Sequence, residues 1–304
     1  MRVDPFYVTN LVGSLDQAQL NAQQLTAELS SGVSINSLSQ NPVGAGENVQ
    51  LLSQIQQDDS FTQSSSLVTG QLQVADSALS SVVTELNTAI SLATSANNGT
   101  MNGSNVRSVG SQISGILDEV TSLANTSYQG QYIFGGGQTL TSPFNTSTAT
   151  TPAVTSYTGD QGVNYLESPS GQKIQLNVPG SQIFLGSGSN SVFGALNNLI
   201  ADYSSGTVNT AQATSDTAAL NSALNWVSQQ RVTIDNSMTQ LSAASGAVTN
   251  VKLQLTTAQT DLMQADIPTV STQLSLAETQ QTALEDVIAQ LNSTSNTLFS
   301  KLPG

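Results

Sequence analysis

The sequence predicts a mainly α-helical, elongated protein: a coiled coil and helical bundle built from the N- and C-terminal halves, with a small β-rich outer domain inserted between them. Apolar residues recur at alternating spacings of three and four in both halves, which is typical of helices that pack along one seam. Between residues 138 and 206 this pattern gives way to Ser/Thr-rich loops and short alternating segments. Only 5% of the residues are aromatic, so bulky side chains for a deep globular core are scarce.

The first half predicts three helices. The N-terminal helix ends at Gly32, and its seam is Val8, Leu11, Leu15, Ala18, Ala22, Leu25 and Leu29. After "SSGVSINSLSQNPVGAG", a much longer seam runs from Val68 to Ala93 and ends at "NNGTMNGS", since Asn-Gly steps favour turns. A third seam covers residues 106–123.

The second half repeats the helical pattern. One long seam runs from Leu220 to Leu262, with Arg231 as a polar break. The last seam is Ile267, Val270, Leu274, Ala277, Leu284, Ile288, Leu291 and Leu298, interrupted by two polar positions. Such stripes are also found in ordinary antiparallel bundles. Because both chain ends are heptad helices, however, we expect the last helix to pair with the first in a coiled coil of their own.

These patterns predict three domains. Residues 1–40 and 264–304 form the terminal coiled coil, residues 41–137 and 207–263 a long-helix bundle, and residues 138–206 the β-rich domain. Within the last, "QKIQLNV" predicts a strand that points Ile174, Leu176 and Val178 inward, and "SVFGALNNLIADYSSG" a short helix. The residues expected to share its small core are Tyr157, Tyr165, Ile183 and Phe184.

The stretch "ANTSYQGQYIFGGGQT", residues 124–139, raises the question of a phosphate-binding loop. No Lys-Ser or Lys-Thr follows the three glycines, and the stretch ends a helix instead of starting one. We expect Gly130 and Gly135 to Gly137 to form a helix C-cap and a flexible exit instead. The predicted domain hinge consists of Gly130, Tyr132, Phe134, Gly135, Gly136 and Gly137.

The composition excludes most catalytic chemistry. Cysteine and histidine are absent, so thiolate metal sites, Cys nucleophiles and imidazole bases are excluded. The acidic pairs, such as Asp118-Glu119, point about 100° apart on a helix and do not converge on a shared proton. Asp160 in "YTGDQG" is interpreted as a turn residue in preference to a calcium ligand. We therefore predict no enzyme, no catalytic residue, no cofactor and no metal site.

Charge and hydropathy also limit the partners. The net charge is -14 and the six basic residues are scattered, so neither nucleic acid nor an anionic membrane is expected to bind. No apolar run is long enough for a membrane helix, and the N-terminus lacks the apolar core and cleavage site of a signal peptide.

Five stretches of the chain are distinctive: "LTAELSSGVSINSLSQNPVGAGENVQL", "LANTSYQGQYIFGGGQT", "YTGD", "VPGSQIFLG" and "ADIPTVSTQLSLAETQQTAL". They resemble the flagellin superfamily of bacteria, most closely its hook-associated junction proteins. Two departures stand out: Gln40-Asn41 replaces the family's paired aspartates before Pro42, and "NTLFSKLPG" extends beyond the usual apolar finish. The resemblance implies that the terminal helices pack in the wall of a tube, with the central helices and β-rich insert outside.

The resemblance implies a structural adaptor that joins the flagellar hook to the filament. Its implied partners are copies of itself, the neighbouring hook-associated protein, flagellin and an export chaperone. Its implied location is the extracellular flagellum, reached through type III export without a cleaved signal peptide. The alternatives are a filament-forming flagellin and, more distantly, a secreted adhesin or tip protein.

Overall fold

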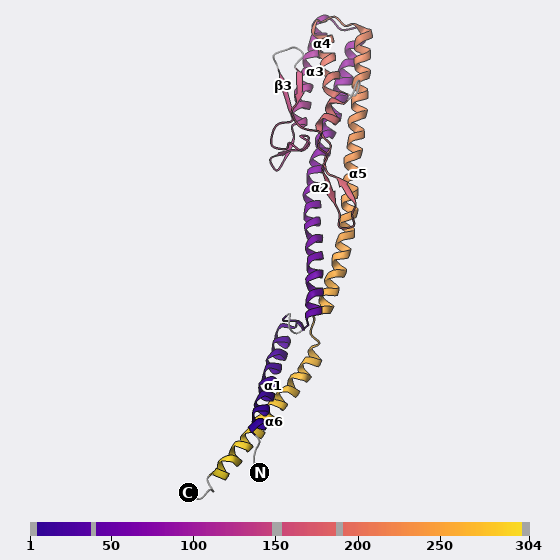
Figure 1. Cartoon of the computed structure of the whole chain (residues 1–304). Helices are drawn as coiled ribbons and strands as arrows, with labels where there is room; N and C mark the ends of the chain where they lie inside the picture. Colours follow the sequence, from indigo (N-terminus) through magenta and orange to yellow (C-terminus); the bar gives the residue numbers. More distant parts are fainter. Residues whose placement is uncertain (1–4, 38–40, 148–153, 187–190, 300–304) are drawn as a thin grey trace. The chain divides into compact units, whose positions relative to one another are not determined.

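A computed structural model describes residues 5–37, 41–147, 154–186 and 191–299 of the chain (Figure 1). The chain divides into two compact units: residues 1–56 with 251–304 form the first unit, and residues 57–250 form the second. Among the described residues, no helix is both long and apolar enough to cross a membrane. The division into three domains stays a prediction.

Long α-helices dominate both halves of the chain, as the seams predict. The helices are α1 (Pro5–Ser31), α2 (Pro42–Asn97), α3 (Gly103–Ala124), α4 (Val192–Ser204), α5 (Thr210–Met263) and α6 (Ile267–Phe299), with a π-helical turn η1 (Ser181–Leu185). The predicted ends at Gly32 and at the Asn-Gly steps are confirmed. Gly32 and Gly99 both have φ near +70°, at +69° and +68°, a conformation that glycine adopts without strain.

Side-chain amides cap the starts of two helices. Asn41 Oδ1 accepts the N–H of Gly44 at 2.9 Å, so Asn41 caps α2, and Pro42 occupies the first helical position. Asn102 caps α3 in the same way, through the N–H of Asn105. At the Gln40-Asn41 departure from the family pattern, an amide therefore supplies the helix cap without a carboxylate.

The segment predicted to be β-rich contains three separate antiparallel strand pairs. The pairs are β1 (Ser127–Tyr128) with β2 (Gln131–Tyr132), β3 (Phe144–Ser147) with β4 (Val154–Tyr157), and β5 (Tyr165–Glu167) with β6 (Lys173–Gln175). The expected strand over "QKIQLNV" is shorter than predicted. It ends because Asn177 turns inward, where its amide donates to Gly162 O and accepts the N–H of Asn164.

The second unit has one continuous hydrophobic core. It includes Leu79 of α2, Ile113 of α3 and Leu220 of α5, all fully buried, and it extends into the strand-containing segment. There the rings of Phe134 and Phe144 pack edge to face on Phe184, with Phe144 and Phe184 centroids 5.3 Å apart.

One residue expected in that small core lies elsewhere. Ile183 and Phe184 are fully buried and Tyr157 is half-buried, but Tyr165 is 57% exposed, so that expectation is wrong for Tyr165. Tyr165 starts β5, and the alternation of the strand turns its neighbour Leu166 to the core instead. Leu176 is half-buried, while Ile174 and Val178 point inward as predicted.

The glycines after α3 have other roles than a helix cap. Helix α3 ends at Ala124 with Asn125 as its C-cap, so the predicted cap at Gly130 is wrong. Gly130, with φ +80°, follows Gln129, with φ +50°, in the two-residue turn between β1 and β2.

The glycine triplet lies in a tight turn around Asp160. A Cβ atom on Gly135 would collide with the carbonyl of Gln138, and one on Gly136 would collide with Asp160. The Asp160 carboxylate accepts the N–H groups of Gly137 and Gly162, and these bonds hold the pKa of Asp160 below its usual range. Close backbone approach therefore accounts for these glycines, and the hinge role of the six predicted residues stays a prediction.

Candidate assembly surface on the terminal helices

In the first unit, α1 and α6 lie side by side (Figure 1). Leu25 of α1 and Val270 and Ala277 of α6 are buried between them, together with Ala265 from the segment just before α6. Ala22, Leu29 and Leu274 pack around this cluster. The predicted pairing of the first helix with the last is therefore observed, and its core is small.

The predicted seam residues mostly lie on the protected faces of the two helices. Leu25, Val270 and Ala277 are buried, and Ile267 is 42% exposed because it begins α6. The seam residues that are half-buried are Leu11, Leu15, Ala18, Ala22, Leu29, Leu274, Leu284, Ile288 and Leu291. Val8 and Leu298 belong to α1 and α6, but their side chains lie outside what the structure describes.

The segment just after α1 pairs through its backbone with the segment just before α6, and this pairing holds one end of the two helices together. Val33 and Gln264 form an antiparallel bridge, the N–H of Ser34 donates to Met263 O at 2.7 Å, and the N–H of Ala265 donates to Gly32 O at 3.0 Å. The heptad analysis missed this pairing, and it missed Ala265 as a core residue. A two-residue contact between segments so far apart in the chain leaves no periodic signal in the sequence.

The start of α6 did carry a local signal. Asp266 accepts the Thr269 hydroxyl at 2.7 Å with its side chain and the N–H of Val270 with its carbonyl. Pro268 follows within the first turn, where a missing N–H costs nothing. The Asp-Ile-Pro sequence therefore indicates the start of this helix.

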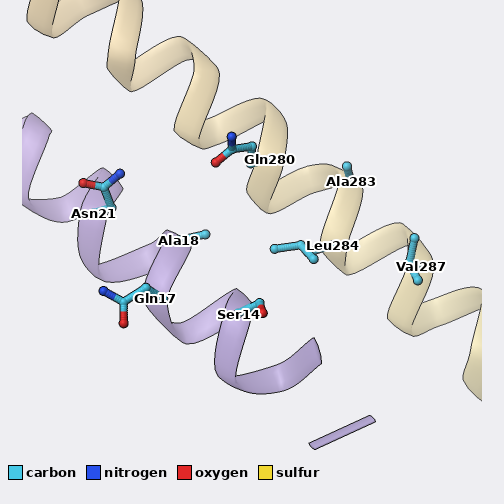
Figure 2. A pocket seen from close by; sticks show the side chains of 8 residues that line it. All are labelled: Ser14, Gln17, Ala18, Asn21, Gln280, Ala283, Leu284 and Val287. Carbon is cyan, nitrogen blue, oxygen red and sulfur yellow. The ribbon is translucent and has the colours of Figure 1, made fainter. Parts of the chain in front are cut away.

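Further along, the seam between α1 and α6 opens into a groove of about 800 Å³ (Figure 2). Ala18 and Leu284 point toward each other across it. The groove is lined by Ser14, Gln17, Ala18 and Asn21 from α1 and by Gln280, Ala283, Leu284 and Val287 from α6. Alanine side chains are too short to fill the space between the helices, so the apolar wall around Leu284 stays accessible.

The charges of the two helices do not assist their pairing. Helices α1 and α6 contain no lysine or arginine, and their acidic residues are Asp16, Glu28, Glu278, Glu285 and Asp286. No ion pair can therefore form between them, and apolar contact must supply the cohesion. Such a groove suits a helix with an apolar face, and it offers no nucleophile or acid–base pair.

Two carboxyl groups, those of Asp202 and Asp216, lie close together in the second unit. Burial and hydrogen bonding to Asp216 raise the pKa of Asp202 to about 6. Asp216 is itself buried and accepts the amides of Asn198 and Gln212. No group of three or more potential metal ligands occurs in the described part of the chain. We interpret this pair as a structural contact between α4 and α5.

Comparison with known proteins finds relatives of part of the chain. Residues 8–139 match the bacterial flagellin N-terminal helical region. Over these residues the chain is similar to flagellin. Flagellar hook-associated protein 3 of Salmonella typhimurium is 28% identical over 187 residues, which are 61% of this chain and 57% of that relative. The protein of the same name from Escherichia coli is 29% identical over 140 residues, which are 46% of this chain and 44% of that relative.

The matches thus span about half the length of these relatives. Two solved structures share the fold of this chain. A candidate flagellar hook-associated protein from Vibrio parahaemolyticus has a TM-score of 0.66 at 19% identity, covering 74% of this chain and 100% of its own. The flagellar junction protein FlgL from Legionella pneumophila has a TM-score of 0.54 at 13% identity, covering 64% and 99%.

Proposed function

We propose that this protein is a structural, non-enzymatic adaptor of the bacterial flagellum that joins hook to filament by self-assembly of α1 and α6. The observation that carries the proposal is the open groove between these two helices, around Ala18 and Leu284. The names of its relatives, flagellar hook-associated protein 3 and flagellar junction protein, support the flagellar setting.

The physical argument is that the helix pair is incomplete by itself. Its buried core consists of Leu25, Ala265, Val270 and Ala277, of which two are alanines. Burying apolar surface contributes about 25 cal/mol per Å², so closing the groove with another helix adds stability that the isolated pair lacks. Assembly is therefore coupled to the stability of α1 and α6.

The partners in this proposal are copies of the chain, the neighbouring hook-associated protein and flagellin, with an export chaperone before assembly. The location is the extracellular flagellum, reached without a cleaved signal peptide. A filament-forming flagellin is the second candidate, because the matched family region over residues 8–139 is described as that of flagellin.

The test is electron microscopy of the purified protein, alone and after addition to isolated hooks. We expect short caps on the hooks and no free polymers. Leu284→Asp, which places a charge in the groove, should abolish the caps while circular dichroism shows unchanged helix content. The matched control is Leu276→Asp on the same helix, where Leu276 is 59% exposed and does not line the groove; caps should remain.

Two results would contradict the proposal. Long filaments growing from the protein alone would favour the flagellin candidate. Caps that persist in Leu284→Asp would show that the groove does not carry assembly.

A further inference from the structure

A second groove, of about 520 Å³, lies in the other unit between the π-helical turn η1 and helix α5. Trp226 and Gln230 line it from α5, Ser181 and Gln182 from η1, and Gln161 from the segment after β4. None of the side chains that line it is charged. This groove shares no residue with the helix pair of the proposed function.

Trp226 is held in a fixed orientation at this groove. It is the single tryptophan of the chain, and its Nε1–H donates to the carbonyl of Gln182 at 2.7 Å. The ring is half-buried, so part of it contacts the protein and part faces the groove. Packing within the second unit explains the buried part only. A tryptophan with one fixed polar end and an accessible ring is suited to ligand contact.

Three side-chain amides line the groove, from Gln161, Gln182 and Gln230. Those of Gln161 and Gln182 are exposed, and that of Gln230 is half-buried. Ser181 Oγ is buried beside the Tyr157 hydroxyl and is not accessible from the groove. Each amide offers both donors and an acceptor. Three amides gathered around one accessible indole ring therefore suit a ligand rich in hydroxyl groups.

The backbone of this wall is also unusual. Five consecutive residues, Ser181–Leu185, form a π-helical turn, and Gly186 ends it with φ +47°. π-helical turns are rare and occur frequently at functional sites. The turn brings Ser181 and Gln182 to the groove and places the carbonyl that orients Trp226.

We propose that the groove between η1 and α5 binds an uncharged saccharide. The indole face of Trp226 would pack on the C–H face of a pyranose ring, and the three amides would bind its hydroxyl groups. A charged ligand is disfavoured because no lining side chain would compensate its charge. The groove is large enough for a short oligosaccharide.

The test uses the full chain and three neutral probes: maltotriose, cellotriose and N,N′,N″-triacetylchitotriose. Because Trp226 is the single tryptophan, its emission reports directly on the groove. We expect at least one probe to change the emission saturably and to give matching heat in titration calorimetry. Gln230→Ala should weaken that binding by about tenfold, the equivalent of one net hydrogen bond. Trp226→Ala should abolish it in calorimetry.

The matched control is Gln240→Ala, an exposed glutamine of α5 that does not line the groove; it should bind as the unchanged chain does. Circular dichroism checks that each variant is folded. Absence of binding by all three probes would overturn the proposal. So would binding that survives both Gln230→Ala and Trp226→Ala, or binding of a neutral Ser/Thr-rich peptide but of none of the sugars.

Discussion

The two units of this chain differ in how much of their apolar surface they can bury alone. The helix pair of α1 and α6 buries four small or medium side chains and leaves a groove beside them. The other unit buries large residues in one continuous core, including Phe134, Phe184 and Tyr203, each at most 1% exposed. A single seam between two helices has one protected side only, whereas several elements around a core protect every side. The first unit therefore has most to gain from a partner.

The largest expected effect comes from removing a core ring of the second unit. Phe184→Ala should lower its free energy of unfolding by roughly 3–5 kcal/mol, because the cavity sits among Phe134, Phe144 and Phe193. Urea unfolding followed by Trp226 emission measures this. Tyr165→Ala is the control, since that ring is 57% exposed and should cost under about 0.5 kcal/mol. Equal losses in the two variants would contradict the described core.

The second largest effect is expected at the contact between α1 and α6. Leu25→Ala should cost about 2 kcal/mol in a cluster of four buried residues. Amide hydrogen exchange should then speed up in both helices, while the unfolding midpoint reported by Trp226 stays the same. Leu20→Ala is the matched control on α1, where Leu20 is 60% exposed. A shift of the Trp226 midpoint in Leu25→Ala would mean that the two units do not unfold separately.

The smallest effect concerns pH and the carboxyl pair of α4 and α5. The pKa of Asp202 is about 6 in the folded protein against an ordinary value of 3.8, so between these values the folded state binds more protons than the unfolded state. Stability should therefore be highest below about pH 4 for this group and should fall as the pH rises through about 6.

Asp202→Asn removes the charge that causes this loss. It should raise the unfolding free energy by about 1 kcal/mol at pH values above about 7, and it should flatten the decline between about pH 4 and 6. Urea midpoints across this range measure both. Asp118→Asn, at an exposed position of α3, is the control and should leave the pH profile unchanged. A variant profile that still falls would assign the pH dependence to another group.

Local patterns predicted the helices and two of their ends well, but they misplaced the end of α3. The seams located all the long helices, because burial along one face imposes a period that any helix must show. Gly130 was expected to end α3, but it turns a two-residue hairpin six residues after Ala124. A glycine in the sequence indicates only that the backbone needs a conformation such as positive φ. Such a conformation occurs both at the C-cap of a helix and in a hairpin turn, so the glycine alone does not distinguish them. Arg231 looked like a break in the α5 seam, and the structure pairs it with Asp76 at 2.8 Å.

The sequence by itself determined that this chain is helical at both ends, that the first and last helices carry complementary seams, and that histidine and cysteine chemistry is excluded. These properties follow from the amino-acid composition and from the spacing of apolar residues, both of which can be read without knowing which distant segments meet. Only the tertiary structure decided where the seam closes around Leu25 and where it opens around Leu284, since this depends on the spacing between two helices. It also brought Trp226 beside η1 and Asp202 beside Asp216, because contacts between distant segments leave no periodic trace in the chain.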